Sequence, residues 1–273
     1  SGVVLSAEQV EAFGRDGFVA GSVVLGEERV EELRAELDRV IAERDRRDVA
    51  QPVQLGNLGG REDSPVWQVV DIWQASPAFR EHLYEEQIVE EVAQLTGADQ
   101  LRVWHDQIQY KPAHHGGVNG WHQDAPLWPP IEPPTQVTAW VALDEVDETN
   151  GCMRMVPGSH AWGDHMAWLG SLDGLDLPAS FEDHQVSVEL RPVRKGAVHY
   201  HHSLTWHASH ANSSDRPRRA IAVHYMTGAT RFAAQGGEHV MRPFITVADG
   251  EVVAGEHFPL VYGGSPVPPA ERR

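Results

Sequence analysis

The spacing of apolar residues changes near residue 100. Before that point apolar side chains recur at helical intervals between charged ones, and between residues 27 and 46 this predicts an amphipathic helix with a solvated, charged face. Its apolar positions are Val30, Leu33, Leu37, Val40 and Ile41. A short strand is expected over 17–25 and a loop over 51–65, where Gly, Asn, Asp and Pro accumulate.

Capping patterns predict three further helices. Ser6 stands three residues before Gln9, which is typical of a capping box at the start of a helix. Ser76 and Pro77 supply an N-cap and a favourable first helical residue. The last of these helices is expected over 85–96, where a glycine follows it.

The rest of the chain consists of short segments rich in Val, Ile and aromatic residues, separated by Gly, Pro or Asn. The expected strands are 101–111, 136–143, 152–156, 186–190, 197–202 and 218–226. Such a series predicts an antiparallel sandwich or barrel. Because no linker separates the two halves, we expect one domain over 1–273, with a mostly helical buttress (1–100) against a β core (101–273). Residues 158–185 form a long insertion, which in a compact domain is often a functional lid.

Composition narrows the partners that the chain can have. It contains 22 Lys and Arg against 40 Asp and Glu, a formal net charge of −18. A protein this acidic lacks the basic surface that nucleic acid or an anionic membrane requires, so neither is expected as a partner. The single cysteine, Cys152, excludes an internal disulfide and favours a reducing compartment. Without an apolar run long enough for a membrane span or a signal-peptide pattern, the sequence predicts a soluble, cytoplasmic protein.

Histidines gather in two segments, 105–122 and 199–210, among sixteen in the chain. In the first segment His122 stands two residues before Asp124, and on a strand both would share a face and could ligate one metal ion. That pair alone is a weak pattern, but the second segment supplies a third histidine. Two histidines and one carboxylate form the facial triad of non-haem Fe(II) oxygenases. A bidentate 2-oxo acid and O2 would use the open positions, and an arginine would suit the far carboxylate of the 2-oxo acid.

Longer motifs surround these residues. They are Gln9-x-x-x-Phe13-x-x-Asp16-Gly17-Phe18, Lys111-Pro112, Trp121-His-Gln-Asp124, Ala139-Trp-Val-Ala-Leu-Asp144, Asn150-Gly-Cys-Met, Val156-Pro-Gly-Ser-His160 and His207-x-Ser209-x-x-Asn212-x-Ser214-x-x-x-Arg218. In these motifs the chain resembles, over most of its length, the phytanoyl-CoA dioxygenase family of Fe(II)/2-oxoglutarate oxygenases. The resemblance implies a mainly β fold with flanking helices around a double-stranded β-helix (jelly-roll, cupin-like) core.

The resemblance also implies roles for individual residues. By this match the iron ligands are His122, Asp124 and His207. Arg218, helped by Ser209, would hold the distal carboxylate of the co-substrate 2-oxoglutarate.

Other residues near the motifs are weaker candidates. Arg219 neighbours Arg218, but strand alternation sends the two side chains to opposite faces. His201 lies near the third ligand without matching the ligand position. In similar proteins the positions of Gln109 and Thr138 touch co-substrate or substrate. Candidate substrate contacts are Trp128, His114, His115, His202 and Trp140.

The resemblance implies a hydroxylation that consumes 2-oxoglutarate and O2 and releases succinate and CO2. Related halogenases have a small residue in place of the carboxylate, so Asp124 favours hydroxylation. A coenzyme A thioester would need clustered cations for its phosphates, whereas the only lysines are Lys111 and Lys195. We therefore expect a small metabolite or natural-product intermediate as substrate. The alternatives are an acyl-CoA hydroxylase of the phytanoyl-CoA type, a cupin-like metal isomerase or hydrolase, and a non-catalytic binding module.

Overall fold

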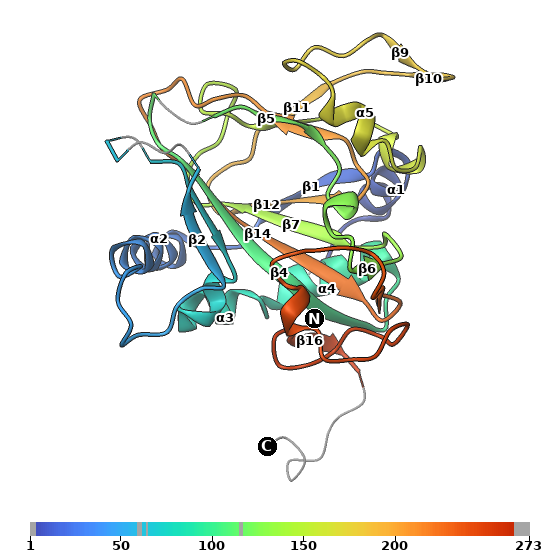
Figure 1. The fold of residues 1–273 in the computed structure, drawn as a ribbon. Helices are drawn as coiled ribbons and strands as arrows, with labels where there is room; N and C mark the ends of the chain where they lie inside the picture. Colours follow the sequence, from blue (N-terminus) through green and yellow to red (C-terminus); the bar gives the residue numbers. More distant parts are fainter. Residues whose placement is uncertain (1–3, 59–61, 64, 115–116, 265–273) are drawn as a thin grey trace.

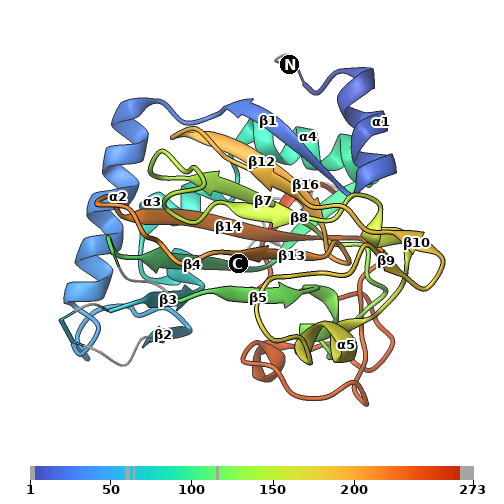
Figure 2. The same ribbon diagram turned by 90° about the horizontal axis from the view of Figure 1, so that it is seen from above.

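Two antiparallel sheets face each other, and helices cover the outer face of the larger sheet (Figures 1 and 2). The computed structural model describes residues 4–58, 62–63, 65–114 and 117–264. In Figure 1 the smaller sheet lies above the larger one, and α3 and α4 lie below it. This layering confirms the predicted jelly-roll core with flanking helices.

The helices begin where the sequence places caps. They are α1 (Ala7–Asp16), α2 (Glu27–Ala42), α3 (Pro77–His82), α4 (Glu86–Thr96) and α5 (Met166–Gly170), with 3-10 turns η1 (Ile72–Gln74), η2 (Ala125–Leu127), η3 (Ser159–Ala161) and η4 (Arg242–Phe244). Ser6 and Gln9 form the predicted capping box, and the Ser76 hydroxyl accepts from the Phe79 amide. Gly97 ends α4 in the left-handed region, at φ 67°, which favours glycine. The helix expected over 27–46 ends earlier, at Ala42.

The larger sheet runs in the order β1-β12-β7-β14-β4-β3-β2, with one further strand, β16, paired with β4. Its strands are β1 (Phe18–Val23), β12 (Ala197–His202), β7 (Val137–Ala142), β14 (Arg218–Thr227), β4 (Gln100–Lys111), β3 (Trp67–Val70), β2 (Gln54–Asn57) and β16 (Leu260–Gly263). The first hundred residues thus contribute three strands as well as four helices.

The smaller sheet has the order β11-β8-β13-β5. Its strands are β11 (Glu189–Arg191), β8 (Met153–Met155), β13 (His207–Ser209) and β5 (Asn119–His122). Two short pairs complete the described strands: β9 (Ser180–Phe181) with β10 (His184–Gln185), and β6 (Ile131–Glu132) with β15 (Arg231–Phe232). Among the described residues no helix is long and apolar enough to cross a membrane.

Side chains on the central strands alternate between two faces, one toward the apolar core and one toward the candidate site. On β14, Ile221, Val223 and Tyr225 point into the main apolar core, which they share with the helices. On the opposite face the same strand presents Arg218 and His224 toward the smaller sheet, where they line a cavity.

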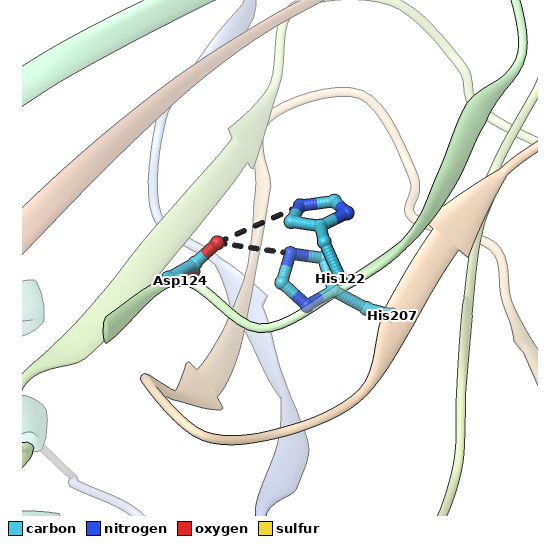
Figure 3. Close-up of side chains that lie close together, drawn as sticks. All are labelled: His122, Asp124 and His207. Atoms are coloured by element: carbon cyan, nitrogen blue, oxygen red, sulfur yellow. Dashed lines mark ion pairs between the residues drawn. The ribbon is translucent and has the colours of Figure 1, made fainter. Parts of the chain in front are cut away.

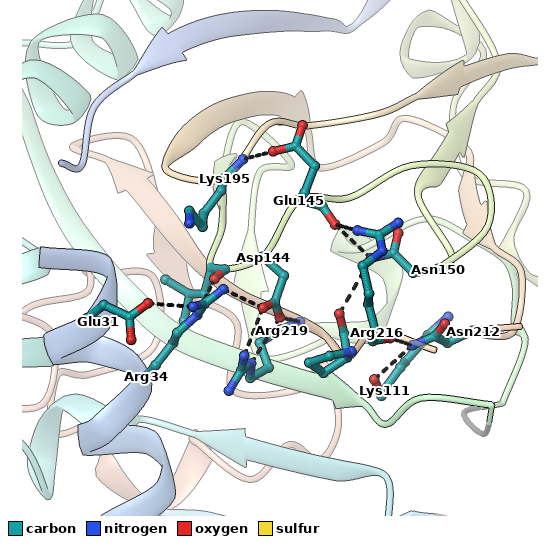
Figure 4. Close-up of polar contacts among 12 residues, drawn as sticks. Glu31, Arg34, Lys111, Asp144, Glu145, Asn150, Lys195, Asn212, Arg216 and Arg219 are labelled. Atoms are coloured by element: carbon teal, nitrogen blue, oxygen red, sulfur yellow. Dashed lines mark hydrogen bonds and ion pairs between the residues drawn. The ribbon is translucent and has the colours of Figure 1, made fainter. Parts of the chain in front are cut away.

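An ionic cluster fastens a helix to the edge of this core. Arg34 on α2 and Arg219 on β14 both donate to the Asp144 carboxylate, at 2.6 Å and 2.8 Å (Figure 4). Asp144 is almost fully buried, so its charge requires these partners.

Two expectations are wrong. The segment 51–65 was expected to be a loop but contains β2, an edge strand whose Gly- and Asn-containing sequence shows no apolar alternation. Asp124 does not share a strand face with His122, because β5 ends at His122 and Asp124 has a helical backbone (φ −75°, ψ −50°). The intervening Gln123 is buried and anchors the segment around 163–165.

Candidate active site

Three side chains predicted to be metal ligands meet between the two sheets (Figure 3). His122 at the end of β5 and His207 at the start of β13 are directly opposite each other in the smaller sheet. The turn after β5 returns Asp124 toward them, with its Oδ1 3.6 Å from His122 Nε2 and 3.3 Å from His207 Nε2. One ligand atom from each residue lies within 4.8 Å of the other two.

The hydrogen bonds of both imidazoles fix which nitrogen faces the centre. Nδ1 of His122 donates to the Gly120 carbonyl at 2.8 Å, and Nδ1 of His207 donates to the Thr205 carbonyl at 2.9 Å. In the neutral tautomer the two Nε2 lone pairs therefore point at the Asp124 carboxylate. Electron-rich atoms that face one another in this way require a cation between them. The donor set and its orientation fit Fe(II).

Charge states at the centre also suit a metal ion. Burial would raise the pKa of Asp124, but His207 and His201 hold it well below the usual range, so this side chain is a carboxylate. Burial lowers the pKa of His122 to about 4, so this ring is neutral. Burial also works against a charged His207, yet the Asp124 carboxylate raises the pKa of that ring. A metal ion would displace a proton held there.

The guanidinium of Arg218 lies in the same cavity, and none of the acidic side chains that the structure describes pairs with it. This side chain is 2% exposed, its Nη1 donates to Gln109 Oε1 at 3.0 Å, and its Cζ lies 5.0 Å above the Trp140 ring. Its buried Nε has no hydrogen-bond partner among the described residues. Burial lowers the pKa of Arg218 to about 10. An unpaired, buried guanidinium that faces a cavity fits a ligand carboxylate.

A polar network extends from Arg218 to Ser209. Gln109 exchanges two hydrogen bonds with Asn119, at 3.0 Å and 2.6 Å. Ser209 Oγ accepts from Asn119 Nδ2 at 3.1 Å and from the buried Lys111 Nζ at 2.8 Å. Sequence reasoning noticed Lys111 as part of a motif but assigned it no role, and it did not identify Asn119.

The cavity has a volume of about 530 Å3 and brings together most of the predicted site. Its lining includes the predicted residues His122, Asp124, His207, Arg218, Ser209, Gln109, Thr138 and Trp140. Thr138 is already engaged, because its Oγ1 lies 2.6 Å from His224 Nδ1. Sequence reasoning named His201 without assigning it a role, and it did not identify Gln68, His224 or the apolar lining side chains Leu58, Val118, Leu127, Met166, Leu169 and Leu172.

Three candidate substrate contacts lie elsewhere. Trp128 packs in an apolar cluster with Trp104 and stacks edge-on against His224, so it supports the cavity wall from behind. His202 faces away from the cavity and contacts His160, with the ring centroids 5.5 Å apart. His114 is exposed and does not line the cavity. His115 lies outside the described residues.

One further histidine contacts the candidate metal ligands directly. His201 on β12 donates from Nε2 to Asp124 Oδ2 at 3.1 Å. This bond engages the carboxylate oxygen that does not face the imidazoles of His122 and His207 and leaves Oδ1 toward them. Strand alternation places His201 on the inner face, but its contact with Asp124 depends on the turn that follows β5.

Comparisons with known proteins agree with this geometry. The model of the phytanoyl-CoA dioxygenase (PhyH) family matches residues 13–220. The peroxisomal phytanoyl-CoA dioxygenase of Rattus norvegicus is 25% identical over 264 residues, covering 90% of this chain and 76% of the rat protein. Among solved structures, the non-heme alpha ketoglutarate dependent carbocyclase SnoK from nogalamycin biosynthesis gives a TM-score of 0.74 and 27% identity, covering 94% of this chain and 96% of SnoK. The epimerase SnoN in complex with Fe3+, alpha ketoglutarate and nogalamycin RO gives 0.71 and 25%, covering 93% of this chain and 97% of SnoN.

Proposed function

The chain belongs to the phytanoyl-CoA dioxygenase family, and from that membership we propose that it hydroxylates an uncharged small metabolite or natural-product intermediate. It is a non-haem iron oxygenase that depends on Fe(II), 2-oxoglutarate and O2. The observation that carries the proposal is that one cavity contains both the His122, Asp124 and His207 triad and the unpaired guanidinium of Arg218.

In this proposal the three triad residues hold the iron, and Arg218 binds the distal carboxylate of 2-oxoglutarate through paired N–H donors. Bound iron and 2-oxoglutarate supply the oxidising chemistry, in which O2 and 2-oxoglutarate are consumed and succinate, CO2 and a hydroxylated product are released. Trp140 packs against the guanidinium and keeps it directed along the cavity. Ser209 lies where its hydroxyl can donate to the same carboxylate. The chain therefore orients the co-substrate and excludes water.

The cavity lining supports an uncharged substrate. Among the described residues Arg218 is the only lysine or arginine that lines the cavity, and the proposed co-substrate occupies it. Three exposed apolar side chains lie among the lining residues: Leu58, Val118 and Leu127, at 60%, 52% and 49% exposure. Such exposure is costly unless a ligand covers it. Within the described part of the chain the cavity offers no further cation for the phosphates of a coenzyme A thioester, which disfavours the acyl-CoA alternative.

We further propose that residues 158–185 form a cover over the substrate side of the cavity. Met166 and Leu169 of α5 and the following Leu172 line the cavity. The segment is tied to the metal-binding loop, since Trp121 Nε1 donates to the Leu175 carbonyl at 2.9 Å and Gln123 Nε2 donates to the Gly163 carbonyl at 2.8 Å. These bonds favour a fixed cover over a freely moving lid. Slow amide hydrogen exchange in this segment already without substrate would support a fixed cover, and fast exchange that slows only on substrate binding would contradict it.

We also propose that the chain forms one domain and that the protein is cytoplasmic. One domain over 1–273 is supported by side chains of α2 and α4, which share a single apolar core with β7 and β14. A cytoplasmic location is supported by Cys152, a lone and buried thiol that suits a reducing compartment.

The deciding experiment is anaerobic addition of Fe(II) and 2-oxoglutarate, followed by O2 and a library of uncharged small molecules. A visible charge-transfer band and substrate-dependent succinate are expected, with products that gain one oxygen atom. Asp124→Ala is the control, since it removes a proposed ligand, and it should abolish both signals. A product that lost two hydrogens would indicate ring closure or desaturation instead, and an unchanged mass would indicate epimerisation. Turnover without succinate would favour the isomerase or hydrolase alternative.

A further inference from the structure

Lys111, at the end of β4, is a fully buried amine with no acidic partner among the described residues. Its Nζ donates to Ser209 Oγ at 2.8 Å and to the His210 carbonyl at 2.7 Å. Its backbone carbonyl accepts from Asn212 Nδ2 at 3.3 Å, which fixes the strand end (Figure 4). A buried ammonium normally has a carboxylate beside it, because desolvation of an unpaired charge is costly.

The nearest charged neighbour of Lys111 is another cation. Lys111 and Arg218 are directly opposite each other on β4 and β14, so both side chains leave the same face of the sheet. The other titratable groups around Lys111 are the buried Cys152 thiol before β8 and the exposed His210 after β13. Burial and the charge of Arg218 together lower the pKa of Lys111 to about 6. With nothing bound beside Arg218, this amine is therefore mostly neutral at physiological pH.

The hydroxyl of Ser209 connects Lys111 to the cavity. A hydroxyl has one donor and two acceptor positions, and Asn119 Nδ2 uses one acceptor position. A protonated Lys111 must use the second, which leaves the Ser209 O–H free to donate into the cavity. A neutral Lys111 can instead accept from Ser209, and then the hydroxyl is turned away from a ligand. A charged Lys111 therefore leaves the Ser209 O–H available to an incoming carboxylate, whereas a neutral Lys111 can compete with the carboxylate for it.

We propose that Lys111 is a second cation of the co-substrate site, buried behind Ser209, and that it takes up a proton when a dicarboxylate binds beside Arg218. The inference rests on the proposed function, since it takes the dicarboxylate to be 2-oxoglutarate. The bound dianion neutralises Arg218 and adds its own favourable field, so the charged form of Lys111 becomes the stable one. Ser209 then donates to the ligand and accepts from Lys111.

Proton uptake determines how affinity depends on pH. A group whose pKa rises on binding takes up a proton between its free and its bound pKa, so binding weakens as the pH increases through that window. The window opens at about 6, the pKa of free Lys111. Above it, the Kd of 2-oxoglutarate should increase by up to about tenfold per pH unit, until the pKa of the bound state is reached.

Calorimetry tests this on the Zn(II)-loaded protein, titrated with 2-oxoglutarate in buffers of different ionisation enthalpy. Uptake of about one proton per ligand is expected at about pH 7.5. Lys111→Met should bind more weakly and take up no proton, whereas Lys195→Met, which removes the other lysine, a half-buried one paired with Glu27, should match the parent protein.

Lysine labelled with 13C at Cε identifies the titrating group even if Lys111→Met does not fold. The chain has two lysines, so two signals are expected, and Lys195→Arg assigns them. One signal should titrate near pH 6 and move to its protonated position when 2-oxoglutarate is added. Binding of 2-oxoglutarate with no proton uptake and no change in the Lys111 signal overturns the inference and leaves the proposed function standing. Failure of 2-oxoglutarate to bind overturns both.

Discussion

Replacing Arg218 by methionine should weaken co-substrate binding and, at the same time, stabilise the ligand-free protein. The guanidinium is 2% exposed and has one hydrogen bond to a neutral amide, with no carboxylate to offset its desolvation. Methionine keeps an unbranched apolar side chain against Trp140 and removes the charge. The two effects have opposite signs because the same unpaired charge costs stability and attracts the ligand.

Both magnitudes follow from the burial of this side chain. A pKa lowered from 12.5 to about 10 corresponds to a cost of about 3 kcal/mol for holding the charge. Loss of the Gln109 hydrogen bond and of the contact with Trp140 offsets about 1–2 kcal/mol of this. A net gain of about 1–2 kcal/mol remains, or roughly 2–4 °C in Tm for each kcal/mol. Removal of one partner from a buried, hydrogen-bonded charge pair costs about 3 kcal/mol or more, so the Kd of 2-oxoglutarate should rise at least about 100-fold.

Arg219→Met is the matched control, since it changes the neighbouring residue on the opposite face of β14. Arg219 donates to Asp144 at 2.9 Å and 2.8 Å, so this variant should lower Tm and leave 2-oxoglutarate affinity unchanged. Thermal melts without ligand and calorimetric Kd values with Zn(II) present measure both quantities. A destabilised Arg218→Met protein that binds 2-oxoglutarate normally would refute the reasoning, because the guanidinium would then be a structural group.

Three other substitutions address the metal centre and the substrate space. Asp124→Ala should remove stoichiometric Fe(II) binding, measured as metal content after dialysis, and bound metal at parent levels would exclude the proposed ligand set. His201→Phe should weaken metal affinity by about 10–100-fold, because the hydrogen bond that orients Asp124 is lost, whereas His202→Phe, whose ring contacts His160 outside the cavity, should not. Ala222→Leu places a larger side chain on the cavity wall, so substrate-dependent succinate should fall while 2-oxoglutarate still binds; full turnover would show that substrate lies elsewhere.

The parts of the fold that sequence predicted best are those whose signal is local. A capping box needs only Ser6 and Gln9, and the long strand β14 shows its apolar face through regular alternation. The edge strand β2 could not be predicted in this way, because its pairing with β3 comes from the partner strand and not from its own side chains. Short strands such as β13, with three residues, are likewise defined by neighbours on both sides.

The site residues show the same difference between local and long-range signals. Motif matching placed Arg218 and Ser209 where the structure finds them, lining one cavity. It failed for Trp128, since an aromatic residue near a metal motif can face either the cavity or the apolar cluster behind it. It also assigned no role to His201 and Lys111, whose importance arises from contacts between residues 77 and 98 positions apart in the sequence. Such contacts form only when the two sheets pack face to face in the folded protein.

The negative net charge of the chain makes its few buried cations important for binding an anionic co-substrate. A net charge of −18 repels a dianionic co-substrate at long range, but salt screens this repulsion beyond about 8 Å, so the local cations decide binding. Most cations are not available for this purpose: Arg34 and Arg219, for example, are both committed to Asp144. Among the described lysines and arginines only Lys111 and Arg218 are fully buried, and they are opposite each other on β4 and β14, with Arg218 lining the cavity. An acidic chain that keeps an unpaired guanidinium and a buried lysine side by side without a counter-ion is stabilised when an anion binds there, and a dicarboxylate that reaches Arg218 and Ser209 supplies that anion.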